Sequence, residues 1–102
     1  MPKRSKSYDE YISKRLINEP DFAKSMVLTS IEEFNESVEE ALKYTISRMG
    51  VKEFSEVSGI PAQNVTAFIK GRRNLKRETL DKYLSFFGLA SKIIVVDSDE
   101  VA

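Results

Sequence analysis

The sequence contains no cysteine and no histidine. It can therefore form no disulfide and no Cys- or His-ligated metal centre, and it lacks the most common general base of enzymes. Glycine-rich phosphate loops and Gly-x-Ser-x-Gly nucleophile motifs are absent too. The four glycines stand apart, each at a position where a helix is expected to end. We predict that the protein is not an enzyme and uses no metal and no cofactor.

Long apolar runs are also missing. The longest is Ile93–Val96, which is far too short to cross a bilayer. The basic first residues are not followed by an apolar stretch, so they do not resemble a secretory signal. The 102 residues, 41% of them hydrophobic, suit one domain with a modest core. We expect a cytoplasmic protein that does not engage a membrane.

The charges balance to zero but are separated along the chain, with 16 basic and 16 acidic residues in all. Residues 61–77 carry no acid and five cations, which are Lys70, Arg72, Arg73, Lys76 and Arg77. Residues 19–40 carry seven acids and a single lysine. This separation suits a protein that touches phosphate with one edge and another partner elsewhere. The alternative is that both runs are simply solvated faces.

Hydrophobic periodicity predicts an all-α fold with five or six helices. The expected helices cover residues 7–17, 20–34, 37–49, 52–58, 61–70 and 79–87. Ser37 is expected to cap the third of them, with Glu40 completing a capping box. Residues 92–96 are β-branched and bounded by turn residues, which predicts one short C-terminal strand. Such a strand needs a partner edge.

The central motif is the stretch EFSEVSGIPAQNVTAFIKGRRNLKR, residues 53–77. Two short helices joined by a glycine-containing turn of three or four residues are typical of a helix-turn-helix. Gly59 stands where the chain needs a left-handed conformation. Phe54 and Val57 of the first helix are expected to pack against three residues of the second: Val65, Phe68 and Ile69.

The other face of the second helix is small or polar and free of acid, which suits insertion into a DNA major groove. Gln63 can contact adenine with two hydrogen bonds, Thr66 can bond a base edge or a phosphate, and alanine can touch a thymine methyl. The expected base contacts are Ala62, Gln63, Thr66 and Ala67. The expected phosphate contacts after this helix are Lys70, Arg72, Arg73 and Asn74.

The stretch VKEFSEVSGIPAQNVTAFIKGRRNLKRETLDKYLSFFGL resembles the lambda-repressor-like, or Cro/XRE-type, helix-turn-helix domain over about residues 38–89. The resemblance implies a recognition helix over 61–70, with the same four base-reading positions. It also implies a phosphate contact at Lys52. Two residues depart from the family pattern, since Ser58 replaces the usual leucine and Ser55 the usual alanine. The first departure predicts a more loosely packed hairpin.

A narrower resemblance takes in YISKRLINEPDFAKSMVLTSIEEFNESVEEAL before the motif and GLASKIIVV after it. Together with the motif, these segments look like the HigA-type addiction-module antitoxins. That resemblance implies a nucleoid-associated homodimer that binds a palindromic operator in double-stranded DNA and represses its own operon. It also implies a partner, a small basic ribonuclease toxin of the RelE/ParE kind.

The acidic N-terminal half is complementary in charge to a basic nuclease. Its aromatic residues are either anchors for a partner or part of the core; they are Tyr8, Tyr11, Phe22 and Phe34. The strand over 92–96 can pair with its copy in a dimer or extend the sheet of a toxin.

We divide the chain into three parts. Residues 1–36 form an N-terminal helical extension for dimer or toxin contact, 37–90 a helix-turn-helix DNA-binding domain, and 91–102 a short strand with an acidic tail. Two alternatives remain open. One is a plain, phage-like Cro-type repressor without a toxin. The other is a helical interaction module whose hairpin does not bind DNA, because short hairpins with a glycine turn also occur in such proteins.

Overall fold

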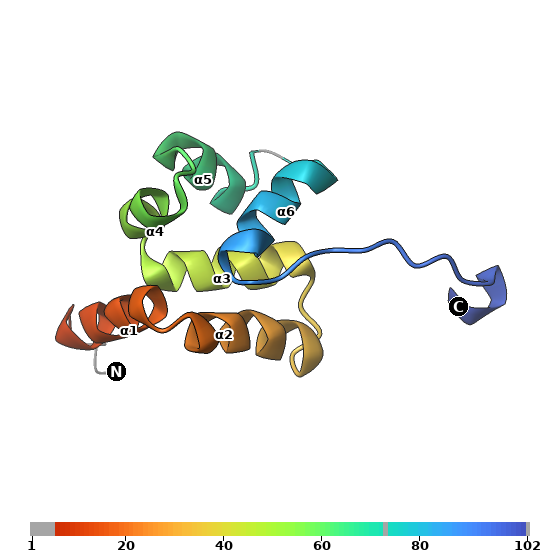
Figure 1. Ribbon diagram of the computed structural model, residues 1–102, viewed down its shortest axis with the longest axis horizontal. Coiled ribbons are helices and arrows are strands. Elements are labelled where there is room, and N and C mark those ends of the chain that lie inside the picture. The colour runs from red at the N-terminus through yellow and green to blue at the C-terminus, as the bar shows by residue number, and fades with distance from the viewer. Residues whose placement is uncertain (1–5, 73, 102) are drawn as a thin grey trace.

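The computed structural model describes residues 6–72 and 74–101, and the side chains of residues 8–72 and 74–99. The described residues form six α-helices and a final 3-10 turn, with no strand among them (Figure 1). The elements are α1 (Lys6–Asn18), α2 (Pro20–Glu32), α3 (Val38–Met49), α4 (Val51–Ser58), α5 (Ala62–Ile69), α6 (Arg77–Phe86) and η1 (Ser98–Val101). The all-α prediction is confirmed for this part of the chain.

The start of α3 follows the predicted cap. Ser37 Oγ accepts a hydrogen bond from the Glu40 amide at 3.1 Å, which satisfies one of the free N–H groups of the first turn. The Glu40 carboxylate does not complete a capping box, because it pairs with Lys43 Nζ at 3.5 Å instead. The structure therefore forms the Ser37 half of the predicted box.

The end of α2 was predicted two residues too late. The helix stops at Glu32, and Phe34 lies in a turn with 69% of its surface exposed. Asn35 has φ 54°, a left-handed conformation that a helix cannot continue through and that asparagine tolerates better than most residues. The amide of Glu36 then bonds to the Ser30 carbonyl at 3.0 Å and turns the chain towards α3.

Helix α3 lies at the centre of the fold. Its residues Ala41, Leu42, Ile46 and Met49 have no exposed surface, and its buried Thr45 hydroxyl donates to the Ala41 carbonyl at 2.9 Å. Helices α1 and α2 lie on one side of α3, and α4, α5 and α6 lie on the other (Figure 1). One continuous hydrophobic core joins the two sides. The α1–α2 layer and α5 therefore present surfaces on opposite sides of the molecule.

An aromatic cluster holds α4 and α5 against α6. The ring centre of Phe54 lies 5.1 Å from Phe86, 5.9 Å from Tyr83 and 6.1 Å from Phe87. The Phe68 ring lies 5.0 Å from Tyr83. Such ring pairs add to the free energy gained by burying apolar area. This cluster fixes how α5 is presented on the surface.

The predicted packing of Val57 inside the hairpin is wrong, since 47% of its surface is exposed. With about 100° per residue, the covered arc of α4 is centred between Phe54, Ser55 and Ser58. Val57 falls outside this arc. Two helix boundaries also differ from the prediction. Pro61 is the N-cap residue that precedes α5 rather than its first residue, and α6 begins at Arg77 rather than at 79.

The strand predicted over 92–96 is not formed in the single chain. These residues are extended and leave the helical body after α6, as Figure 1 shows. A strand requires a neighbouring edge, and the described residues contain no other strand. Among the described residues, no helix combines the length and apolar character needed to cross a bilayer.

Candidate nucleic-acid interface

The turn between α4 and α5 is built on Gly59, which ends α4 in a left-handed conformation with φ 79° and ψ 2°. Its amide bonds to the Ser55 carbonyl at 3.0 Å. Nothing within 4 Å would obstruct a β-carbon at this position. The backbone angle, rather than space, is therefore the reason for glycine here.

Two serine side chains form hydrogen bonds within the same turn. Ser55 Oγ donates to the Ile60 carbonyl at 2.7 Å, and Ser58 Oγ accepts from the Ile60 amide at 3.1 Å. Both polar groups of the Ile60 backbone are therefore satisfied by side chains of α4. Ser58 was expected to loosen the hairpin, but the structure gives both serines a hydrogen-bonded role that fixes where α5 begins.

Helix α5 has a buried face and an outward face. Val65 and Phe68 have no exposed surface. Because they face the core, the opposite side of α5 faces solvent. Ala62, Gln63 and Lys70 are exposed, while Thr66 and Ala67 are half-buried. At about 100° per residue, these five positions occupy an arc of about 140°. The structure therefore brings all four predicted base-contact residues onto one outward face, which we call the α5 face.

The chain that follows α5 is folded back onto it. Gly71, with φ 73°, bonds to the Phe68 carbonyl at 3.1 Å, and the Arg72 amide bonds to the Ala67 carbonyl at 2.9 Å. This pair of bonds is the Schellman arrangement, which needs a left-handed residue after the helix. It holds the backbone of Arg72 beside the last turn of the α5 face.

Three of the cations around the hairpin lack acidic partners among the described residues. Lys52, Lys70 and Arg72 are exposed, and none of them forms an ion pair with the described part of the chain. Asn74 is exposed as well. The predicted phosphate contact Arg73 lies outside the described residues. Charges left unpaired by their own protein remain available to phosphate oxygens.

Arg77 has a different role. Its Nε donates to Ser91 Oγ and its Nη2 to the Ser91 carbonyl, both at 3.2 Å. Asp81 Oδ1 accepts from the Ser91 hydroxyl at 2.6 Å and from the Ser91 amide at 3.0 Å. These three residues attach the C-terminal segment to α6. Sequence reasoning missed them, because their separations of 10 and 14 residues follow no helical or strand period.

The same contacts change the acidity of Asp81. The hydrogen bonds from the Ser91 hydroxyl and amide, helped by the Arg77 charge, lower the pKa of this carboxyl below its ordinary value of 3.8. A group whose folded-state pKa is lowered stabilises the fold above its unfolded-state pKa. That contribution is lost as the pH falls below about 3.8 and through the lowered value.

We therefore expect the Ser91 amide resonance to titrate in an NMR pH series with a midpoint below 3.8. Ser91→Ala should move this midpoint up, because it removes the hydrogen bond that lowers the Asp81 pKa most. Asp81→Asn should abolish the titration step. A wild-type midpoint at or above 3.8 would contradict the network.

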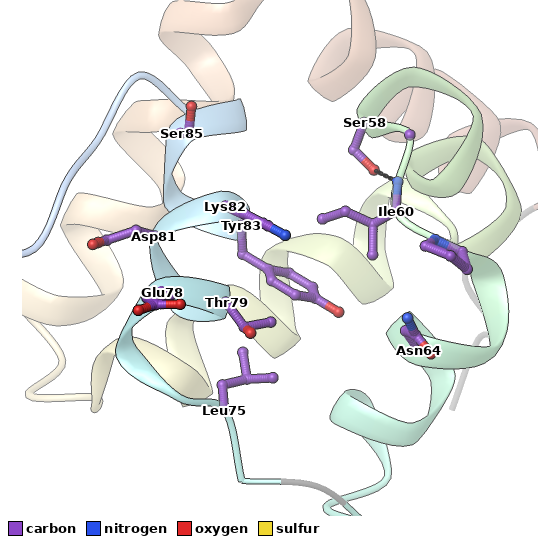
Figure 2. Close-up of a pocket in the computed structure, with 12 residues that line it drawn as sticks. Ser58, Ile60, Asn64, Leu75, Glu78, Thr79, Asp81, Lys82, Tyr83 and Ser85 are labelled. Carbon is purple, nitrogen blue, oxygen red and sulfur yellow. Dashed lines mark hydrogen bonds between the residues drawn. The ribbon is translucent and has the colours of Figure 1, made fainter.

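A groove of about 640 Å³ separates α5 from α6. Figure 2 shows Asn64 on one wall, with Glu78, Thr79 and Asp81 on the other. Lys82 also lines the groove, and Figure 2 shows its side chain pointing towards α5, while the carboxylates of Glu78 and Asp81 point away from α5. Asn64 lies on the groove side of α5 and outside the α5 face.

A second notable surface lies on the far side of α3, at the α2–α3 turn. Phe34 and Tyr44 are 69% and 52% exposed. They line a shallow pocket of about 370 Å³ with Ser30 and the carboxylates of Glu36 and Glu40. We call this region the acidic aromatic surface. Exposed aromatic side chains rimmed by charge are typical of partner-binding surfaces.

The four aromatic residues singled out in the sequence divide unequally. Tyr8, Tyr11 and Phe34 are 46%, 59% and 69% exposed, which makes them accessible to a partner. Phe22 is half-buried, with the Arg15 guanidinium 3.9 Å from its ring centre. Tyr8, Tyr11 and Phe34 therefore lie outside the core, whereas Phe22 packs against it.

Comparison with known proteins found no matching family model, no matching curated protein and no matching solved structure. No group of three or more acidic side chains within the described part of the chain is placed to share a metal ion.

Proposed function

We propose that the protein is a sequence-specific DNA-binding protein in which α4 and α5 form a helix-turn-helix and α5 is the recognition helix. One observation carries the proposal. The α5 face has no acid and is followed by exposed cations at Lys70 and Arg72, which form no ion pair within the described part of the chain. Small and polar side chains allow a helix to approach base edges, and flanking cations neutralise the phosphates beside them.

Each half of a palindromic operator would be read by one copy of the chain in a dimer, with half-sites about one helical turn apart. Gln63 is the residue on the α5 face best suited to a base, since its amide can bond both N6 and N7 of adenine. Thr66, Ala62 and Ala67 supply a hydroxyl and methyl groups. Lys52, Lys70, Arg72, Arg73 and Asn74 are the proposed phosphate contacts.

The test is a titration of the purified protein on a duplex from just upstream of its own gene, followed by gel shift at two salt concentrations. Specific binding should survive unrelated competitor DNA and weaken steeply as salt rises. If no shift forms at either salt concentration, the proposal fails. The protein would then be a helical interaction module.

Gln63→Ala should weaken binding to the best site and relax the preference at one base pair. We expect a loss of about 1–3 kcal/mol, the usual contribution of a bidentate base contact. The matched control is Asn64→Ala, which removes an exposed amide from the groove side of the same helix. Equal losses in both variants, measured by fluorescence anisotropy on site variants, would contradict base reading by Gln63.

We propose further that this DNA-binding protein is the antitoxin of a toxin–antitoxin operon, acting in the cytoplasm on its own promoter. The acidic aromatic surface favours this reading over a plain repressor. It offers apolar rings and carboxylates suited to a small basic ribonuclease, and the α2–α3 turn that carries Phe34 and Glu36 lies on the other side of α3 from α5 (Figure 1). The two partners could then bind at the same time.

The gel shift separates the two readings when it is repeated with the product of the adjoining gene. A small basic protein that alters the migration of the protein–DNA complex, and whose nuclease activity the chain suppresses, supports the antitoxin. Unchanged migration and unaffected nuclease activity would leave a plain Cro-type repressor. DNA binding is measured without the second protein, so the two parts of the proposal fail separately.

A further inference from the structure

The C-terminal segment of residues 92–96 is extended, mostly apolar and exposed. Ile93, Ile94, Val95 and Val96 are 72%, 67%, 92% and 45% exposed. No backbone hydrogen bond joins these residues to another part of the described chain. Figure 1 shows the segment running away from the helical body by itself. Extended backbone with free N–H and C=O groups is a template for pairing with another strand.

The segment is attached to the helical body at its start and is followed by a local turn at its end. At its start, Ser91 is bonded to Asp81 at 2.6 and 3.0 Å, so the segment leaves α6 from a defined point. At its end, Asp97 Oδ1 accepts from the Asp99 amide at 3.0 Å, where η1 begins. Five residues, Lys92 to Val96, remain free to pair, and the middle one is Ile94.

The charges flanking the segment indicate which partner it fits. A cation, Lys92, stands at its start, and two carboxylates, Asp97 and Asp99, follow its end. When two copies pair antiparallel, the start of one strand lies beside the end of the other, so the lysine of each copy lies at the same end of the ribbon as the carboxylates of its partner. Parallel pairing would place like charges together, which is unfavourable. The segment is therefore complementary to itself.

We infer that residues 92–96 form a two-stranded antiparallel ribbon with the same residues of a second copy of this chain. Neighbouring side chains of a strand point to opposite faces. The two-fold axis that relates antiparallel strands runs perpendicular to the ribbon. The residue at the axis must therefore lie directly opposite its own copy. With Ile94 on the axis, Ile94 faces its own copy, Ile93 faces Val95, and Lys92 faces Val96.

The ribbon deepens the proposed function, because it supplies the two-fold symmetry that a palindromic operator requires. Its existence does not depend on DNA binding, however. A two-stranded ribbon alone is only marginally stable in water. The dimer should therefore depend on protein concentration, and it should be strengthened when adjacent half-sites hold two copies close together.

The first experiment is sedimentation equilibrium of the full chain without DNA, over a range of concentrations. The wild-type protein should dimerise reversibly, and Ile94→Asp should raise its dissociation constant at least tenfold by placing two carboxylates on the axis. Phe34→Asp is the matched control, since it also charges an exposed apolar residue outside a helix. Circular dichroism should show unchanged helix content in both variants.

A cysteine experiment tests the register, and the chain has no cysteine of its own. Ile94→Cys should oxidise to a covalent dimer, because directly opposed residues have β-carbons about 4.5–5.5 Å apart. Val95→Cys should not, because its copy would lie diagonally at roughly 7–8 Å. Crosslinking of the Val95→Cys variant alone would overturn the register.

Three outcomes would overturn the ribbon itself. One is a wild-type chain that stays monomeric at every concentration. Another is a dimer that Phe34→Asp dissociates and Ile94→Asp leaves intact, which would place the contact on the acidic aromatic surface. The third is a monomer whose segment 92–96 gains amide-exchange protection only with the product of the adjoining gene, which would assign the strand to that protein's sheet. A dimer without operator binding would instead refute the proposed function and keep the ribbon.

Discussion

Phe54→Ala is expected to lower the free energy of unfolding by about 3–5 kcal/mol, the usual cost of emptying a buried phenylalanine site. Phe54 has no exposed surface, and its ring contacts Tyr83, Phe86 and Phe87 of the α6 region. The variant would lose the contacts that hold α4 to α6. Since small domains are stable by only about 5–15 kcal/mol, the loss is a large fraction of the total.

Urea unfolding followed by circular dichroism measures this loss. Val57→Ala is the matched control, because it shortens an apolar side chain on the same helix that is 47% exposed. Its effect should stay within about 0.5 kcal/mol. If Phe54→Ala and Val57→Ala had equal effects, the aromatic cluster would not be the support of the hairpin.

The double variant Lys70→Gln/Arg72→Gln should bind all duplexes more weakly by a similar factor. Loss of two phosphate contacts reduces the slope of log affinity against log salt by about 1.8, which corresponds to roughly 10- to 100-fold at about 0.1 M salt. Both side chains are exposed and lack acidic partners among the described residues. The free energy of unfolding should therefore hardly change.

Fluorescence anisotropy between 50 and 200 mM salt, a range of strong salt effect for such contacts, measures the slope. Lys24→Gln is the control, because Lys24 is an exposed cation on α2, across α3 from the α5 face. It should leave the slope unchanged. An unchanged slope in the double variant would show that these cations do not contact phosphate, whether or not the α5 face contacts bases.

Comparing the double variant Lys70→Gln/Arg72→Gln with Gln63→Ala separates two contributions to binding. Removing the cations changes affinity for every sequence, whereas removing the glutamine amide changes the preference between sequences. A variant of the α5 face that lost affinity uniformly would indicate damage to the position of the helix. The urea experiment on Phe54 shows how much of that position depends on the core.

Local patterns in the sequence were sufficient for the helices and for much of the α5 face. Helical periodicity placed all six helices, because apolar residues at this spacing must cover one side of each helix. Ser37 was correctly predicted as a cap, and Gly59 as a left-handed helix end. Each of these features depends on residues within one or two turns of each other. The arc formed by Ala62, Gln63, Thr66 and Ala67 follows from the same periodicity.

Contacts between distant segments decided the rest. The exposure of Val57 and the attachment of Ser91 to Arg77 and Asp81 depend on how separate elements meet. No sequence period encodes such a meeting. The β-branched run at 92–96 was recognised as strand-forming, but a strand exists only with a second edge. The sequence by itself determined the helices and their faces, while the tertiary structure decided which faces remained free, because burial is a property of the packed chain.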